Sequence, residues 1–397
     1  MDAGSARGGI DAIRRWTHRW VDDGPLPGAS TLVAHHGEVA LFEHAGVRDL
    51  DTGGPIEADT LFRIYSMTKP VTAVAALCLV QDGLLGLDDP VAETVPSFAR
   101  LTVNRHGVGE LVEGVAASTP MTVRHLLTHT SGLTYGEGNP GAISRRYVEE
   151  RTDFGPDDGP LSEVVDRLAD IPLLFEPGTA WNYGVSLDVL GRVIEVAAGA
   201  PLDVVIRERI TQPLGMRDTG FRVPSAELGR LAALYEATPD GGLRLLEKGV
   251  EEPTTLSGGA GLVSTATDYF RFAEMLRGGG ALDGVRVLDD TLVRQMTSDQ
   301  LPADLAAMGS PTFNETTTAG VGFGLGVSVV VDPSRTAWRC GRGEFAWGGY
   351  ASTAFWVDPE HDVTVVFMTQ VIPSDRYPLR EELRMLVADA LLPEVAG

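Results

Sequence analysis

The stretch FRIYSMTKPVTAVAAL, residues 62–77, decides how the rest of the sequence is interpreted. The mostly apolar residues that follow Ser66 predict a helix over 66–82, and Gly83 is expected to end it. Ser66 and Lys69 stand three residues apart, so on a helix their side chains share one face and reach each other. A helix that begins at Ser66 also places unpaired N–H groups and the positive end of its dipole beside the serine oxygen.

Lysine is scarce in this chain, which makes its place beside a serine informative. The sequence has thirty arginines and only two lysines, Lys69 and Lys248. A neutral lysine can take a proton from serine and a charged one can stabilise an alkoxide, whereas arginine does not lose its proton. The S-x-x-K motif therefore predicts nucleophilic catalysis, with Ser66 as nucleophile and Lys69 as its activator. The competing interpretation is a solvated pair on a helix surface.

Length, charge and cysteine content restrict the class of protein. At 397 residues the chain exceeds the size of one hydrophobic core, so two lobes are expected. The net charge of −23 argues against nucleic acid and anionic membranes as partners. No run of about eighteen apolar residues occurs, and the start MDAGSARGGIDAIRRW lacks the apolar stretch of a secretory signal, so the cytoplasm is expected. Cys78 and Cys340 are too few for a disulfide framework.

Strand patterns gather toward both ends of the chain, and helical patterns dominate its middle. Helices are expected at 9–23, 161–170, 186–198, 202–211, 266–277, 289–297 and 378–391, and strands at 29–36, 39–47, 323–331, 336–340, 351–357 and 362–369. Residues 102–120 and 138–161 look like irregular excursions. We predict an α+β fold, an antiparallel sheet flanked by helices with an inserted, mostly helical lobe. Residues 1–85 and 245–397 form the mixed lobe, 86–244 form the helical lobe, and a site is expected between them.

Six further segments stand in a recognisable order with residues 62–77. They are LLTHTSGL at 126–133, EPGTAWNYGVSLDVLGRVIE at 176–195, QPLGMRDTGF at 212–221, GGAGLVSTATDYFRF at 258–272, FGLGV at 323–327 and WGGYASTAFWVDPE at 347–360. With these motifs the chain resembles the serine beta-lactamase-like and penicillin-binding protein superfamily, which has the class C beta-lactamase fold. Within it the chain is most similar to the family VIII carboxylesterases. The resemblance spans nearly the whole chain and implies a beta-lactamase/transpeptidase-like fold.

The resemblance implies roles for individual residues. Ser66 and Lys69 match the family's nucleophile and its lysine, and Tyr183 matches the catalytic tyrosine that opens the Tyr-x-Asn motif of beta-lactamases. Whether Lys69 or Tyr183 takes the first proton stays open at this point. The backbone N–H groups of Ser66 and Tyr350 are implied as the oxyanion hole, a pair of donors that stabilises the negative charge of the transition state.

Two departures from the beta-lactamase motifs bear on the substrate. Trp347 stands where the third motif carries a lysine for the substrate carboxylate, and Val185 replaces the asparagine that recognises the substrate amide. Both changes favour a neutral acyl or alcohol group over a carboxylate-bearing lactam. The glycines after Trp347, Gly348 and Gly349, allow close approach of a substrate to the backbone. Tyr135 is a further candidate for the pocket lining, with core packing as its alternative.

We therefore predict a serine carboxylesterase that hydrolyses small, short-chain esters through an acyl-enzyme on Ser66. Alternatives at the same residues are acyl transfer, D-aminopeptidase activity and weak beta-lactamase activity; a non-catalytic binding protein of this fold is another. No metal or cofactor is expected, because Leu126 stands where an HExxH motif between His125 and His129 needs glutamate. The small-molecule ester is the expected partner, and the oligomeric state stays open.

Overall fold

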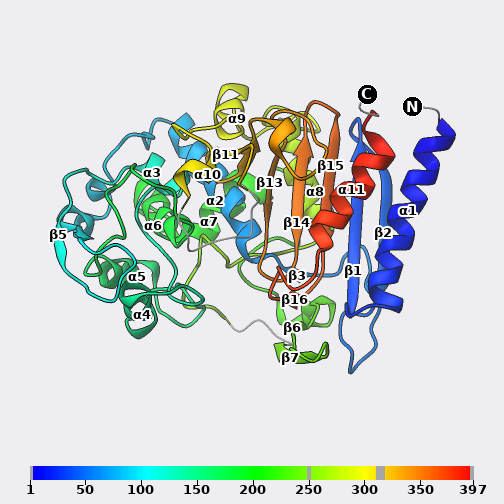
Figure 1. Cartoon of the computed structure of the whole chain (residues 1–397), viewed down its shortest axis with the longest axis horizontal. Helices are drawn as coiled ribbons and strands as arrows, with labels where there is room; N and C mark the ends of the chain where they lie inside the picture. The colour runs from blue at the N-terminus through cyan, green and yellow to red at the C-terminus, as the bar shows by residue number, and fades with distance from the viewer. Residues whose placement is uncertain (1–2, 248–251, 310–317, 394–397) are drawn as a thin grey trace.

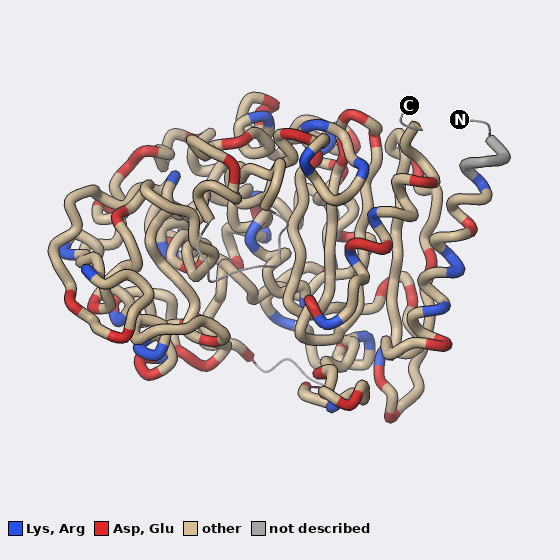
Figure 2. The backbone as a smooth tube through the Cα atoms, in the orientation of Figure 1, with Lys and Arg blue, Asp and Glu red and all other residues tan. Residues whose placement is uncertain are grey.

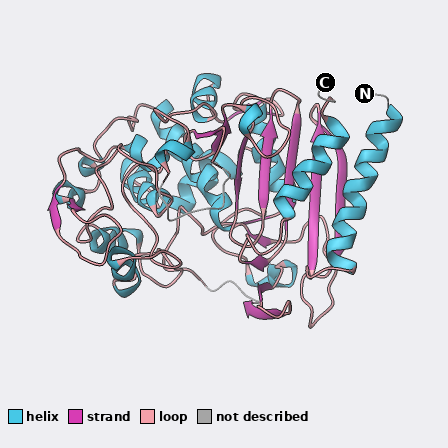
Figure 3. Ribbon diagram, viewed as in Figure 1, coloured by secondary structure: helices cyan, strands magenta, loops and turns pink. Residues whose placement is uncertain are grey.

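The centre of the protein is an antiparallel sheet built from both ends of the chain (Figures 1 and 3). The computed structural model describes residues 3–247, 252–309 and 318–393. Within these ranges the sheet has seven strands in the order β11-β12-β13-β14-β15-β1-β2. Their bounds are β1 Gly28–His35, β2 Glu38–Gly46, β11 Val321–Phe323, β12 Ser328–Val330, β13 Phe345–Gly348, β14 Ala354–Asp358 and β15 Val363–Met368.

The strand β1 joins the two ends of the chain in this sheet. It pairs with β15 on one side, in a register that places Leu32 opposite Val366, and with β2 on the other. Because helices cover both faces at this point, nearly every residue of β1 is buried. The strand accordingly reads GASTLVAH, without a regular alternation of polar and apolar residues.

Helices from opposite ends of the chain cover one face of the sheet. The helices α1 (Ala3–Asp22) and α11 (Leu379–Leu391) pack side by side there (Figure 1), and Ile13, Trp16, Leu383 and Val387 belong to the same buried cluster. The helices α2 (Thr68–Gln81) and α8 (Ala266–Arg277) share the larger core on the opposite face with Phe355 and Val366. The sheet therefore lies between two apolar layers, which is the arrangement its sequence pattern requires.

The helical part of the chain lies beside this sheet, and its helices α6 and α7 pack against α2 (Figure 1). Its helices are α3 Val123–Leu127, α4 Ala142–Glu149, α5 Leu161–Leu168, α6 Ser186–Ala198 and α7 Leu202–Ile206, which a π-helical turn, η4 Arg207–Thr211, continues. Elsewhere the helices are α9 Asp290–Met296 and α10 Leu305–Met308, with 3-10 turns η1 Tyr65–Met67, η2 Val91–Glu93, η3 Pro96–Arg100, η5 Ser225–Arg230 and η6 Pro333–Arg335. The small strands are β3 Phe62–Arg63, β4 Thr102–Asn104, β5 Gly114–Ala116, β6 Leu234–Ala237, β7 Leu243–Glu247, β8 Val263–Ser264, β9 Ala281–Leu282, β10 Val285–Arg286 and β16 Val371–Ile372.

The predicted α+β fold, an antiparallel sheet flanked by helices, is confirmed, but three local predictions are wrong. Residues 336–340 form a loop after η6, because the Thr336 N–H donates to the Pro333 carbonyl at 3.4 Å instead of to a neighbouring strand; the strand is β13, further along. Residues 323–331 contain a turn, and the strands β11 and β12 lie on its two sides. The helix expected from Ser66 begins at Thr68.

The excursions at 102–120 and 138–161 contain regular structure, the β4–β5 hairpin and α4 respectively. The predicted boundaries of the two lobes stay a prediction. No helix in the described part of the chain has both the length and the apolar character needed to cross a membrane.

Candidate active site

A strained turn presents Ser66 at the start of α2. The short strand β3 pairs with β8, and the Ile64 N–H donates to the Leu262 carbonyl at 3.1 Å, so the chain that enters the turn is fixed. Tyr65 then adopts a φ of +44°, a conformation that is costly for a bulky residue and often found at functional sites. Ser66 follows in the 3-10 turn before α2 and keeps partial solvent exposure.

Lys69 lies one turn further on α2 and is 1% exposed. Its Nζ donates to Ser66 Oγ at 3.2 Å, to Tyr135 Oη at 2.9 Å and to the Gly259 carbonyl at 2.8 Å. A lysine ammonium carries three N–H groups and no acceptor, so three acceptors match its charged form. The buried charge is therefore hydrogen-bonded on all its donors, and Nζ is held beside the serine oxygen.

Tyr183 and Tyr135 come from two chain segments that hydrogen-bond to each other. The Asn182 N–H donates to the His129 carbonyl at 2.9 Å, and Asn182 Nδ2 donates to the Leu133 carbonyl, also at 2.9 Å. The motif segments LLTHTSGL and WNYGV are thereby joined, and each presents its tyrosine to the lysine. The two tyrosine rings lie 5.4 Å apart between centroids.

The electrostatics of this group separate the two tyrosines. Lys69 Nζ lies 4.7 Å from the centroid of the Tyr183 ring, over its negative face. Burial raises the pKa of Tyr135 well above its usual value, and the nearby Tyr183 and Asp188, together with a hydrogen bond to Tyr183, act in the same direction. Tyr135 therefore stays a phenol, which accepts a hydrogen bond from Lys69 and still has its own proton to donate.

Gly259 and Asp188 complete the surroundings of Lys69, although neither was predicted as a site residue from the sequence. The Gly259 N–H donates to Asp188 Oδ1 at 2.9 Å, and Ser257 Oγ donates to the same oxygen at 2.5 Å. Burial raises the pKa of Asp188, whereas the charge of Lys69 and these hydrogen bonds oppose that rise. An aspartate within the apolar stretch SLDVLG of α6 was the available signal, because such an acid needs buried partners.

The segment Trp347-Gly348-Gly349 forms the end of β13 beside the nucleophile. The Trp347 ring is 7% exposed and lies 5.3 Å from the Tyr183 ring, so it borders the catalytic tyrosine candidate. A Cβ on Gly349 would lie 2.3 Å from the Ile64 carbonyl oxygen, so this glycine allows β13 to approach the turn that carries Ser66. Tyr350 follows and is 46% exposed, with its ring against that of Tyr65.

Not every residue predicted for the site reaches it. Ser66, Lys69, Tyr183 and Tyr135 come together, Trp347 borders them and Tyr350 lies on the adjoining turn. Val185 is 0% exposed, because it packs into the core at the start of α6, and it cannot present the apolar surface expected of it. The second lysine, Lys248, lies outside the described residues.

The two histidines of LLTHTSGL have separate structural settings. The Thr122 N–H donates to His125 Nδ1 at the start of α3, as part of a capping box. His129 is fully buried against the rings of Trp181, Tyr183 and Phe323, and within the described residues neither of its ring nitrogens has a hydrogen-bond partner. Burial, together with the charge of Lys69, lowers the pKa of His129 well below its usual value, so it is neutral.

The arrangement agrees with comparisons to known proteins. Residues 13–390 match the family described as Beta-lactamase. Protein Rv1367c of Mycobacterium tuberculosis is 39% identical over 362 residues, which cover 89% of this chain and 88% of that protein. Esterase EstB of Burkholderia gladioli is 35% identical over 391 residues, which cover 93% and 91% of the two chains. The solved structure of EstCE1, described as a hydrolase with promiscuous acyltransferase activity, matches with a TM-score of 0.77 and 28% identity over 98% of this chain and 99% of that one. The resemblance drawn from the motifs is thereby confirmed, and the chain belongs to the beta-lactamase family.

Proposed function

We propose that this protein is a serine carboxylesterase that hydrolyses small, short-chain esters through an acyl-enzyme on Ser66. More broadly, it is a serine ester hydrolase or acyltransferase of its family. The observation that carries the proposal is the contact of the buried Lys69 ammonium with both Ser66 Oγ and Tyr135 Oη. Burying a lysine ammonium costs free energy of desolvation. Because this lysine contacts a serine that solvent can reach, a catalytic role explains its burial better than a stabilising one.

The first half of the reaction forms the acyl-enzyme. Ser66 Oγ attacks the ester carbonyl carbon while its proton passes to the phenolate oxygen of Tyr183. Lys69 acts as a fixed positive charge, because all three of its N–H groups already have acceptors. Tyr135 donates its proton in a hydrogen bond to Tyr183 and so helps to fix the position of the Tyr183 oxygen. When the tetrahedral intermediate collapses, the bond to the alcohol oxygen breaks and Tyr183 returns the proton to the departing alcohol.

The second half releases the acid. A water molecule attacks the acyl carbon and gives a proton to Tyr183, and Tyr183 passes it to Ser66 Oγ as the ester bond to the enzyme breaks. In both halves the negative oxygen accepts hydrogen bonds from the backbone N–H groups of Ser66 and Tyr350. Such donors contribute several kcal/mol when they are fixed before the reaction.

The side chains around the serine favour a neutral substrate. Trp347 occupies the place where lactam recognition needs a cation, and Tyr65 and Tyr350 add aromatic surface at the adjoining turns. Acyl transfer is the second candidate, because an alcohol in place of water would attack the same intermediate. The description of EstCE1 as a hydrolase with promiscuous acyltransferase activity supports this candidate.

We further propose the cytoplasm as the compartment and small esters as the only partners needed for activity. Both cysteines are free, which suits a reducing compartment. The net charge of −23 disfavours nucleic acid and anionic membranes, and in the part of the chain that the structure describes basic residues are interspersed among acidic ones (Figure 2).

The test compares three substrates in the wild type and in Ser66→Ala, with the exposed Ser225→Ala as a control. We expect turnover of a nitrophenyl acetate to exceed that of a chromogenic cephalosporin and of a D-alanyl peptide. Ser66→Ala should lower ester turnover by at least about a thousandfold, and a fluorophosphonate should label Ser66 alone by mass spectrometry. Unchanged ester turnover in Ser66→Ala would refute the assignment, and a higher rate with the cephalosporin or the peptide would refute the substrate class.

A further inference from the structure

Arg380 of α11 reaches the backbone beside the active site from the opposite face of the sheet. Its Nη2 donates to the Gly349 carbonyl at 2.7 Å and to the Thr353 carbonyl at 3.0 Å. These two carbonyls flank the turn that joins β13 to β14. Leu379 and Leu383, buried on the same helix at 1% and 0% exposure, anchor α11 on the sheet. The guanidinium is therefore mounted on a fixed element.

The first of these carbonyls belongs to the same peptide group as the N–H of Tyr350. In a trans peptide the C=O and the N–H point in opposite directions, so a group that holds one also orients the other. The Gly349 carbonyl accepts hydrogen bonds from both Arg380 and the Ser352 N–H, the latter at 3.1 Å. The Thr353 carbonyl, also bound by Arg380, accepts the Gly349 N–H at 2.9 Å. One guanidinium nitrogen thus joins both sides of the turn.

The glycine of β13 makes this contact possible. A Cβ added to Gly348 would lie 2.5 Å from Arg380 Cζ, so any larger residue would displace the guanidinium. The need for glycine here comes from the arginine, in addition to any approach of a substrate to the backbone.

We propose that Arg380 is a positioning residue, which orients and polarises the Gly349–Tyr350 peptide whose N–H is the second oxyanion donor. A charged donor on the carbonyl strengthens the opposite N–H as a donor and restrains it at its working position. The inference rests on the proposed function, because the oxyanion hole has a role only if Ser66 attacks a carbonyl group.

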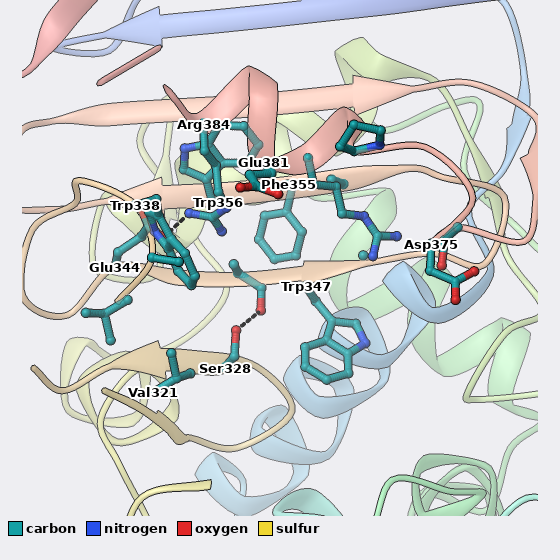
Figure 4. Close-up of a pocket in the computed structure, with 18 of the residues that line it drawn as sticks. Val321, Ser328, Trp338, Glu344, Trp347, Phe355, Trp356, Asp375, Glu381 and Arg384 are labelled. Carbon is teal, nitrogen blue, oxygen red and sulfur yellow. Dashed lines mark hydrogen bonds and ion pairs between the residues drawn. The ribbon is translucent and has the colours of Figure 1, made fainter. Parts of the chain in front are cut away.

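A cavity of about 470 Å³ lies along this same face and gives small molecules access to the guanidinium. Arg380, Gly348 and Trp356 are among its lining residues. Figure 4 shows its far end, where Arg384 lies between Trp338 and Trp356 and pairs with Glu344. Loss of the Arg380 side chain would enlarge a space that solvent already enters, so an added guanidinium can occupy the vacated position.

The experiment measures kcat and KM for a nitrophenyl acetate in Arg380→Ala, with and without millimolar methylguanidinium. Arg376→Ala is the matched control, because Arg376 is an exposed arginine of the same cavity whose guanidinium donates to the Thr238 carbonyl, away from the turn. We expect Arg380→Ala to lower kcat on the order of tenfold, less than the loss when an oxyanion donor is removed outright, with KM within about twofold. Methylguanidinium should restore part of kcat, whereas methylammonium, which lacks the planar fork, should not.

Gly348→Ala provides the second measurement and keeps the arginine in the protein. It should lower kcat alone, yet add little to the loss in an Arg380→Ala background, because the clash disappears with the guanidinium. If Arg380→Ala does not fold, Gly348→Ala is instead compared alone and in an Arg380→Lys background. An unchanged kcat in a folded Arg380 variant, a loss that appears only in KM, or a loss that methylguanidinium does not relieve would overturn the proposal. Loss of activity in Ser66→Ala together with any of these results would contradict the role of Arg380 and leave the proposed function intact.

Discussion

The Lys69 ammonium and the Gly259 carbonyl oxygen meet at 2.8 Å, although 190 residues separate them in the sequence. Gly259 in turn donates its N–H to Asp188, so the position of Lys69 depends on a segment that is bound to α6. The same segment accepts a hydrogen bond from Thr72 of α2 at the Gly258 carbonyl, at 2.7 Å. Hydrogen bonds from α2 and to α6 therefore hold the segment whose carbonyl accepts from Lys69.

This contact predicts that Gly259→Ala impairs catalysis. A Cβ at this position would lie 2.3 Å from Asp188 Oδ2 and must displace either the backbone or the carboxylate. We expect kcat/KM for a nitrophenyl ester to fall by at least about tenfold, because misplacement of a catalytic group by about an ångström is costly. Gly229→Ala, where nothing lies within 4 Å of the added carbon, is the control. Equal activity of the two variants would show that the Gly259 carbonyl does not fix Lys69.

Lys69→Met should separate activity from stability. The substitution keeps an unbranched side chain of similar length and removes a buried charge, so we expect kcat to fall by about a thousandfold or more. The melting temperature should stay level or rise, because a group placed for catalysis is commonly a cost to stability. Thermal unfolding monitored by circular dichroism measures the second quantity. A marked drop in melting temperature would instead assign Lys69 a structural role.

Tyr183→Phe should lower kcat/KM much more than Tyr135→Phe does. Tyr183→Phe removes the proposed base, and we expect a loss of at least about a thousandfold in kcat/KM. Tyr135→Phe removes a hydrogen-bond donor to that base, so the expected loss is about ten- to a hundredfold. Retention of activity in Tyr183→Phe alone would exchange the two roles.

The buried His129 should make stability depend on pH. Its pKa is lowered in the folded protein, whereas in the unfolded chain histidine has a pKa of about 6.5. Below about pH 6.5 the unfolded state therefore binds a proton at this histidine and the folded state does not. The free energy of unfolding falls as the pH falls, by up to about 1.4 kcal/mol per pH unit.

His129→Phe removes this proton and should flatten the curve. Urea unfolding at pH 7.5 and 5.5 measures the difference, which should shrink by about 1 kcal/mol in the variant. His36→Asn, at a side chain 67% exposed, is the control for removal of a surface histidine, and it should flatten the curve less than His129→Phe does. Parallel curves for His129→Phe and the wild type would contradict the prediction.

Local patterns sufficed for the parts of the protein that local sequence determines. The spacing of Ser66 and Lys69 on a helix requires only helical geometry, and the elements β1, β2, α6 and α11 follow from apolar runs and periodicity. The roles of Gly259 and Asp188 depend on a contact between chain segments that are far apart in the sequence. The local sequence of neither segment predicts that contact. The same holds for Arg380, whose contacts with Gly349 and Thr353 exist only after α11 has packed on the sheet.

The wrong strand at 336–340 shows how a pattern can mislead. Thr336, Trp338 and Cys340 stand at alternate positions, as residues on one face of a strand would, but Trp338 lies in a loop and stacks on Arg384, with 4.6 Å between the guanidinium carbon and the ring centroid. Trp338 also packs against the larger apolar core, so its partial burial comes from several side-chain contacts made by a loop residue. Periodicity records which residues are buried and does not record what buries them.

The pairing of β1 with β15 has a consequence for folding of the chain during its synthesis on the ribosome. The hairpin β1–β2 emerges early, but its inner edge stays without its partner until more than 360 residues have been made. During that time an apolar strand with unsatisfied backbone groups is open to pairing with other chains. Synthesis of this protein should therefore depend on protection of its first hairpin, and chains truncated before β15 should aggregate and not accumulate as a folded domain.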